Sequence, residues 1–171
     1  MKSLFWQRVD LVVRSLTPFF LTLVLVVLGQ VPLHVPGLAE VAPILPLMAV
    51  YHWAIYRPDL LPASAVFFAG LIQDALSGMP FGVNAAVFVT VHMVVLSQQI
   101  FFQGKSFLII WLGFSMVAAG AVSMIWVLNA MVFASVSSVQ AAFIQYLVTV
   151  GVFPLLALML VRWQRTVLAQ I

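Results

Sequence analysis

Long runs of apolar residues, separated by short clusters of polar residues, proline and glycine, dominate this sequence. A helix needs about 20 apolar residues to cross the hydrocarbon core of a bilayer, with about 17 as a practical minimum. Six runs approach or exceed that length, and breaks such as Arg57-Pro58-Asp59 and Gln103-Gly104-Lys105 separate them. The predicted spans are residues 16–33, 41–56, 62–78, 84–102, 107–133 and 139–161. The pattern therefore predicts an all-α, polytopic membrane protein that forms a single domain over residues 1–171.

Proline and glycine mark several of the predicted helix ends. Pro62 suits the first helical position of the third span, because a first-turn N–H has no partner within its own helix. Gly78, followed closely by Pro80, is a stop signal for the same span. Pro46 is expected to bend the second span, and Pro154 is expected to bend the last one.

The composition supports a membrane location and narrows the chemistry. Hydrophobic residues make up 65% of the chain, charged residues only 6%, and the mean hydropathy is +1.21. A soluble domain carries about 25% charged residues, so four acids and seven bases cannot cover a water-facing surface of this size. The absence of cysteine excludes disulfides, thiolate metal sites and a cysteine nucleophile.

The basic residues predict the orientation of the spans. Alternating the loops places every base on one side of the membrane, namely Lys2, Arg8, Arg14, Arg57, Lys105, Arg162 and Arg165. The positive-inside rule makes that side cytoplasmic, so both termini are predicted to lie inside. Because these bases sit beside apolar segments and form no long basic tract, they are topology signals, and nucleic acid is not a predicted partner.

The region before the first span allows two interpretations. Polar side chains recur at helical spacing at Ser3, Gln7, Asp10 and Arg14, opposite an apolar stripe. Such a segment is either an amphipathic helix on the inner leaflet or the water-exposed end of a long first helix. A cleaved signal peptide is disfavoured, because the nearest cleavage-like site, Gly37-Leu38-Ala39, lies far beyond the apolar run.

Asp74 is the most informative ionisable residue within a predicted span. It shares one helix face with Gly70 and Gly78, so another backbone can approach that face closely. It also lies near the C-terminal end of its helix, where the helix dipole disfavours an anion. We expect backbone N–H groups of residues 79–83 and of the next helix, beginning with Asn84, to offset this unfavourable interaction by donating hydrogen bonds to the carboxylate. This arrangement pins a hairpin between the third and fourth spans; proton or ion coupling is the alternative function.

The two histidines within predicted spans favour structural roles. His92 has no histidine or carboxylate three or four residues away, as a helical metal site would require. It is expected to form a hydrogen bond inside the bundle. His52, beside Trp53 and Tyr56, is expected to lie at the cytoplasmic membrane interface.

Ser115, Ala119 and Ser123 form a stripe of small residues in the fifth span. Such a stripe packs against another helix, either within the chain or in a partner. The sequence leaves both possibilities open.

The chain carries no recognisable catalytic signature. It lacks a G-x-S-x-G turn, an H-E-x-x-H pair and a glycine-rich phosphate loop. Its four acids are scattered over different loops and spans, so no carboxylate pair can be proposed. We therefore predict a protein that is not an enzyme, with no catalytic residue, cofactor or metal.

The middle third of the chain resembles the rod shape-determining protein MreD family. The resemblance rests on Arg57-Pro58 and on Gly70-x-x-x-Asp74-x-x-x-Gly78, followed by a short turn with Pro80 and Gly82, and then Asn84. Phe81 stands where the family more often has leucine. Chain length, six-span topology and Pro154 before a basic tail are similar as well.

This resemblance implies a non-enzymatic scaffold in the bacterial inner membrane, within the elongasome that maintains rod shape and lateral peptidoglycan synthesis. It implies direct association with the bitopic protein MreC, and an assembly that includes MreB, RodA and a class B penicillin-binding protein. The structural or partner-interface residues it indicates are Gly70, Asp74, Gly78, Pro80, Gly82, Asn84, Arg57 and Pro58.

A second hypothesis is a small-molecule-binding subunit of a membrane transporter. The family is similar in architecture to the substrate-binding subunits of energy-coupling vitamin transporters, which is an analogy of fold alone. Asn84, His92 and Gln145 would then line a cavity. A proton- or ion-coupled carrier using Asp74 is a third hypothesis.

Overall fold

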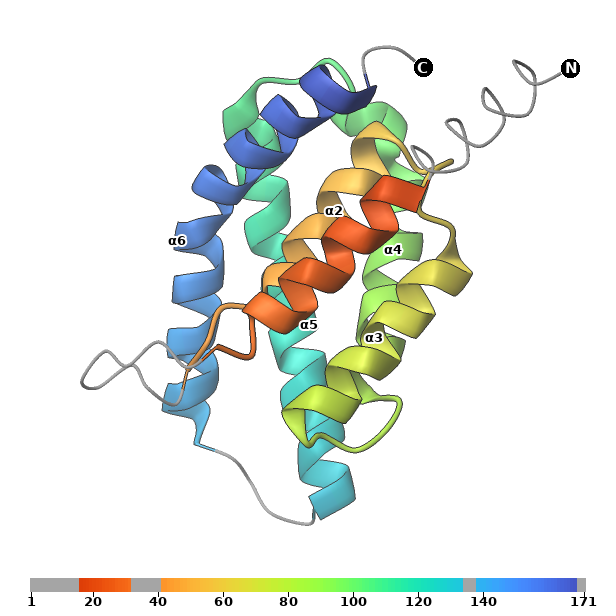
Figure 1. The fold of residues 1–171 in the computed structure, drawn as a ribbon. Helices are drawn as coiled ribbons and strands as arrows, with labels where there is room; N and C mark the ends of the chain where they lie inside the picture. The colour runs from red at the N-terminus through yellow and green to blue at the C-terminus, as the bar shows by residue number, and fades with distance from the viewer. Residues whose placement is uncertain (1–15, 32–40, 134–137, 169–171) are drawn as a thin grey trace, which may run out of the picture.

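The computed structural model describes residues 16–31, 41–133 and 138–168. Within these ranges the chain forms six α-helices, one π-helical turn and no β-strand, which confirms the predicted all-α class. The helices are Leu16–Leu28, α2 (Leu45–Tyr56), α3 (Ala63–Ser77), α4 (Val83–Phe102), α5 (Phe107–Phe133) and α6 (Val139–Trp163), followed by the π turn Gln164–Leu168. Figure 1 shows them gathered into one bundle.

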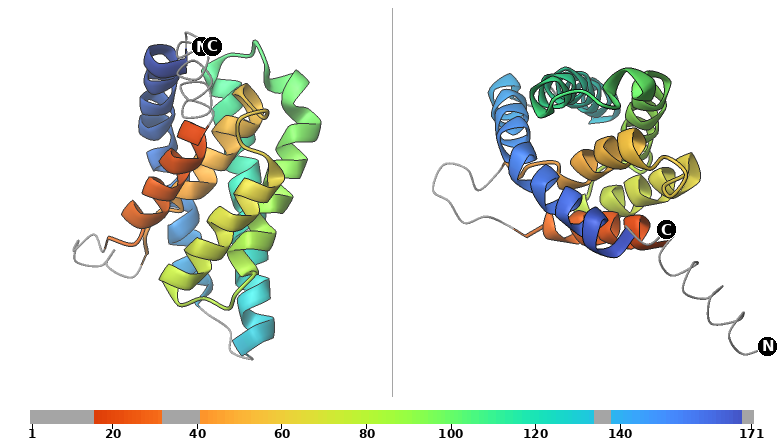
Figure 2. Two further views of the ribbon diagram at one scale, coloured as in Figure 1. Left: turned by 45° about the vertical axis from the view of Figure 1, so that its right-hand side comes forward. Right: turned by 90° about the horizontal axis from the view of Figure 1, so that it is seen from above.

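Helix α2 lies at the centre of this bundle. Seen from above, α6, α5, α4, α3 and the helix Leu16–Leu28 surround it (Figure 2). Every residue of α2 from Pro46 to Ile55 is buried. A helix that is apolar on all sides belongs in an interior, and α2 is accordingly the core around which the longer helices pack.

Tyr51 shows how α2 is fixed in place. Its ring packs edge-on against three phenylalanines from three other helices, Phe102, Phe114 and Phe153. Its hydroxyl donates a 2.9 Å hydrogen bond to the carbonyl oxygen of Ile110. A buried tyrosine needs such a partner for its polar end, so this one side chain joins α2 to α4, α5 and α6.

The second predicted segment begins later than expected. The helix starts at Leu45 rather than at residue 41, and Pro46 lies in its first turn, where a proline costs no hydrogen bond. The expected bend at Pro46 was therefore wrong. Residues 41–44 are not helical; α6 holds them through Thr149, whose hydroxyl accepts the Ile44 N–H at 3.2 Å, and Gln145, which donates to the Ala42 carbonyl at 3.2 Å.

Among the residues that the structure describes, three helices are long and apolar enough to cross a membrane by themselves. They are Val83–Phe102 with 20 residues, Phe107–Phe133 with 27 and Val139–Thr166 with 28. By contrast, α2 has 12 residues and α3 has 15, below the minimum of about 17. Pro154 lies inside α6, and the axis of that helix changes direction along its length (Figure 1).

Helix α3 ends as the sequence predicts, and begins one residue later. Pro62 occupies the capping position in an extended conformation, one residue before the helix, instead of the first helical position. At the other end, Gly78 adopts the left-handed conformation with φ of 66° and stops the helix. The chain then turns back, so that α3 and α4 pack as a hairpin (Figure 1).

Candidate functional site

Asp74 is fully buried and accepts four hydrogen bonds from the start of α4. Its Oδ1 receives the backbone N–H and the side-chain amide of Asn84, both at 2.9 Å. Its Oδ2 receives the N–H of Gly82 at 2.9 Å and that of Ala85 at 3.4 Å. The partners expected from the sequence are therefore the ones observed.

This carboxyl group caps α4 from a neighbouring helix. The first N–H groups of any helix lack partners within that helix, and Gly82, at the N-cap of α4, has no side chain to supply one. Asp74 takes the N–H groups of residues 82, 84 and 85, and the carbonyl of Pro80 takes that of Val83 at 3.3 Å. Every N–H from residue 82 to 85 thus has an acceptor, and the positive end of the α4 dipole faces the acid.

Three glycines allow this geometry, for two different reasons. A β-carbon at Gly70 would lie 2.4 Å from the Cα and 2.7 Å from the backbone N of Ala85. Only a residue without a side chain therefore lets α3 and α4 come this close. Gly78 and Gly82 have open space around them but φ angles of 66° and 101°, which other residues rarely adopt.

Arg57 and Pro58 lie at the opposite end of α3 from this cluster, in the turn between α2 and α3. The structure thus brings together Gly70, Asp74, Gly78, Pro80, Gly82 and Asn84, and leaves this pair apart. The Nε of Arg57 is 3.5 Å from an oxygen of Asp59, whose side chain is 63% exposed. The Arg57 carbonyl accepts the N–H of Leu60 at 3.1 Å and closes the turn.

The family model of rod shape-determining protein MreD matches residues 10–169, nearly the whole chain. This chain belongs to the MreD family. The resemblance found in the sequence is therefore confirmed, and the chain is a membrane protein. A curated relative, an uncharacterised protein of Rickettsia prowazekii (strain Madrid E), is 28% identical over 72 residues, 42% of this chain and 40% of that protein. No solved structure matches the chain.

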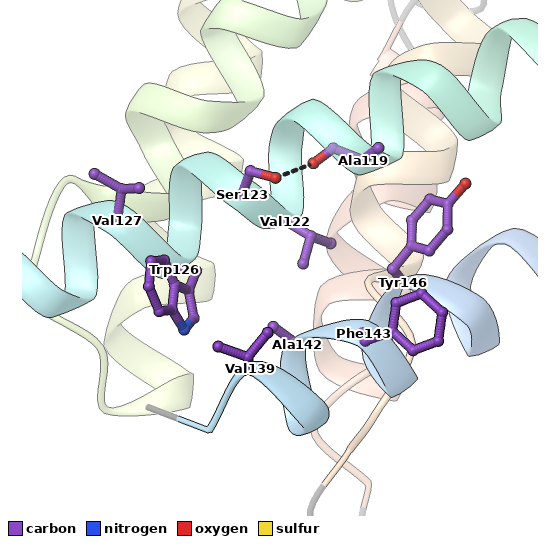
Figure 3. A pocket seen from close by; sticks show the side chains of 9 residues that line it. All are labelled: Ala119, Val122, Ser123, Trp126, Val127, Val139, Ala142, Phe143 and Tyr146. Atoms are coloured by element: carbon purple, nitrogen blue, oxygen red, sulfur yellow. Dashed lines mark hydrogen bonds between the residues drawn. The ribbon is translucent and has the colours of Figure 1, made fainter. Parts of the chain in front are cut away.

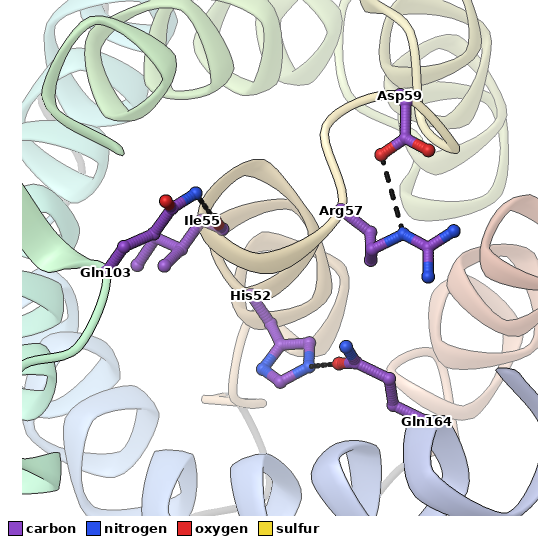
Figure 4. Close-up of polar contacts among 6 residues, drawn as sticks. All are labelled: His52, Ile55, Arg57, Asp59, Gln103 and Gln164. Atoms are coloured by element: carbon purple, nitrogen blue, oxygen red, sulfur yellow. Dashed lines mark hydrogen bonds and ion pairs between the residues drawn. The ribbon is translucent and has the colours of Figure 1, made fainter. Parts of the chain in front are cut away.

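The end of the bundle opposite the Asp74 hairpin carries further polar contacts that converge on α2 (Figure 4). His52 donates from Nε2 to the side-chain oxygen of Gln164 at 3.3 Å, and Gln103 donates to the carbonyl of Ile55 at 3.3 Å. These bonds fasten the end of α6 and the end of α4 onto the last turn of α2. Sequence reasoning missed Gln103 and Gln164, because a polar residue at a helix end usually faces water.

Two expectations for the histidines are corrected. His52 is only 2% exposed, so it is buried inside the bundle and does not face lipid or water, as an interfacial side chain would. His92 is also 2% exposed, but its Nδ1 has no hydrogen-bond partner among the described residues, where a bond had been expected. Within the same ranges no three histidine, aspartate or glutamate side chains are grouped as metal ligands.

A groove of about 540 Å³ runs between α5 and α6 (Figure 3). Its lining is almost entirely apolar and comes from Ala119, Val122, Ser123, Trp126 and Val127 of α5, and from Val139, Ala142, Phe143 and Tyr146 of α6. The Ser123 hydroxyl donates to the Ala119 carbonyl at 2.7 Å, so it requires no outside partner.

The stripe of small residues in α5 lies partly in this groove. Ala119 and Ser123 are both exposed, so no described helix of the chain packs over them. The sequence had left open whether this stripe packs within the chain. At these two positions the described part of the chain does not cover it.

Proposed function

We propose that this chain is a non-enzymatic, multi-pass scaffold in the bacterial inner membrane. In this proposal it helps maintain rod shape and lateral peptidoglycan synthesis by binding a partner of the MreC type. The wider assembly would contain MreB, RodA and a class B penicillin-binding protein. Membership of the MreD family over nearly the whole chain is the observation that carries the proposal.

The hydrogen bonds and the burial of Asp74 support a scaffold and not a carrier or a catalyst. Both of its oxygens accept hydrogen bonds from the chain itself, and the residue is fully buried. A proton- or ion-carrying acid needs a side that is open to its cargo. Asp74 is instead placed to hold the α3–α4 hairpin rigid, which suits a protein that presents surfaces to partners.

The proposed topology has six membrane segments with both termini inside. Three long helices support it directly by their length. Helices α2 and α3 are shorter, and α2 is shielded by its neighbours, so in this topology it reaches one face of the membrane through the non-helical residues 41–44. The α2–α3 turn, the α4–α5 turn and the end of α6 lie together at one end of the bundle (Figure 1), as the distribution of basic residues requires.

We further propose that the α5–α6 groove receives the single transmembrane helix of the partner. Small residues allow close approach between helices in a bilayer, where packing replaces the hydrophobic effect. Ala119 and Ser123 supply such a surface and are not used inside the described part of the chain. The Gly70 face, by contrast, is already occupied by Ala85.

The alternative hypothesis, a small-molecule-binding subunit of a transporter, is weakened by the structure. Two of the three polar residues that suggested a ligand cavity are engaged within the chain: Asn84 binds Asp74, and Gln145 binds the carbonyl of Ala42. Neither side chain is therefore free to recognise a small molecule without giving up an internal bond.

Depletion of the chain in a rod-shaped host tests the proposed function. Cells should lose their rod shape and become round, and the MreC partner should lose its normal placement. Re-expression of the unaltered chain should restore both properties. If depleted cells stayed rod-shaped and the MreC partner kept its normal position, the proposed function would be wrong.

A further inference from the structure

The end of α6 and the π turn that follows it each carry one exposed arginine. Arg162 and Arg165 are exposed, and within the described ranges neither has an ion-pair partner. The other described cations are engaged: Arg57 lies near Asp59, and the Lys105 ammonium is 5.4 Å from the centre of the Phe101 ring. Among the residues that the structure describes, both unpaired arginines therefore lie at this one helix end.

The rotation of the helix at this point is fixed by Gln164. Its side chain is held inward by His52 of α2, at 3.3 Å, so the adjoining side chains are directed away from the bundle. Arg162 and Arg165 are both exposed and flank Trp163 and Gln164 in the sequence; the Trp163 side chain is 41% exposed.

The helix length places this pair at the level of lipid headgroups. The apolar segment Val139–Thr166 has 28 residues, about 42 Å at about 1.5 Å per residue. The hydrocarbon core is only about 30 Å thick, so the end of the segment extends beyond it. An exposed tryptophan at that depth is typical of the boundary between hydrocarbon and headgroups.

The Thr166 side chain weakens one obstacle to an anion near this helix end. Free carbonyls there carry partial negative charge and would repel a phosphate. The Thr166 hydroxyl donates to the carbonyls of Arg162 and Trp163, at 3.0 and 3.1 Å. Guanidinium groups bind phosphate oxygens in a forked, bidentate manner.

We propose that Arg162 and Arg165, with Trp163 at the boundary, bind the phosphate headgroup of an anionic phospholipid. The site rests on the membrane placement given under the proposed function, but not on the role in rod shape. The inner leaflet is rich in anionic lipid, and each basic side chain near it contributes about 1 kcal/mol. That energy corresponds to about fivefold in binding for each arginine.

Native mass spectrometry of the full chain, released from nanodiscs that mix phosphatidylglycerol with phosphatidylcholine, tests the site. The unaltered chain should retain phosphatidylglycerol preferentially. The single variant Arg162→Gln should lower that retention about fivefold, and the double variant Arg162→Gln/Arg165→Gln about thirtyfold. Lys105→Gln removes the same charge as a single variant, from a cation at the same end of the bundle but outside the proposed site, and should lower retention less than Arg162→Gln does.

Three results would overturn the proposal. The first is equal phosphatidylglycerol retention by the double variant and the unaltered chain. The second is an effect of Lys105→Gln as large as that of Arg162→Gln, which would indicate bulk charge. The third is displacement of phosphatidylglycerol by inorganic phosphate at equal concentration, which would indicate an anion site without lipid specificity. None of these results depends on cell shape, so failure of the lipid site would not contradict the proposed function in rod shape.

Discussion

Gly70 of α3 approaches Ala85 of α4 so closely that a β-carbon on the glycine would lie 2.4 Å from the Cα of the alanine. One turn further along α3, Asp74 binds the N–H groups of residues 82, 84 and 85. The close approach and the capping depend on each other: the acid reaches the start of α4 because the glycine lets the two backbones meet.

The first prediction concerns this contact. Gly70→Ala should lower the free energy of unfolding by about 1–3 kcal/mol, the usual cost of forcing extra volume into a packed site, because the clash is with backbone atoms that cannot rotate away. Thermal or denaturant unfolding in detergent measures it. Gly120→Ala is the matched control, since a β-carbon at Gly120 meets no atom within 4 Å. Equal stability of the two variants would contradict the close packing.

The second prediction concerns the capping acid. Asp74→Ala should be strongly destabilising, because each buried N–H left without an acceptor costs about 1–3 kcal/mol. Asp74→Asn should be intermediate, since it keeps one acceptor oxygen but turns an NH₂ group towards other donors. Asp59→Asn, at a carboxyl group that is 63% exposed, is the control and should change stability little. The hairpin account fails if Asp74→Asn matches the unaltered chain in unfolding experiments.

The third prediction separates conformational strain from steric clash. Gly78→Ala and Gly82→Ala should each cost about 1–2 kcal/mol, because both positions require a left-handed backbone although neither lacks space. Asparagine tolerates that conformation better than alanine, so Gly78→Asn should recover part of the loss. If the asparagine variant is less stable than the alanine variant, packing rather than backbone strain governs the position.

The fourth prediction concerns the groove between α5 and α6. Ser123→Leu fills space at an exposed position, so it should weaken copurification of the MreC-type partner while leaving the unfolding temperature nearly unchanged. Ala86→Leu, at an exposed alanine on α4, is the control and should bind the partner normally. If both variants lost partner binding, or if neither did, the groove would not be the surface that binds the partner.

The hairpin could be predicted from sequence because its parts are close along the chain. Asp74 and its partners fall within residues 74–85, and a glycine followed by a proline indicates where the helix stops. The spacing of Gly70 and Asp74 places both on one face without any knowledge of the other helices. Local pattern and local structure therefore agree in this segment.

The central position of α2 could not be predicted in the same way. Its contacts are made with residues far along the chain: Tyr51 with Ile110, Ile44 with Thr149, and His52 with Gln164. An apolar run has the same composition whether it faces lipid or other helices, so burial by protein leaves no trace in the hydropathy. For that reason His52 was placed at the membrane interface, and the beginning of α2 was placed at residue 41.

The most direct test of the scaffold account is site-specific photo-crosslinking in cells of a rod-shaped host that depend on this chain. A probe at Ser123, in the exposed groove, should crosslink to a single-span protein of the MreC type. A probe at Ala69, buried beside the α3–α4 contact, should yield only crosslinks within the chain. If the Ser123 probe reached no other protein while the cells kept their rod shape, this chain would not work through a partner helix in that groove.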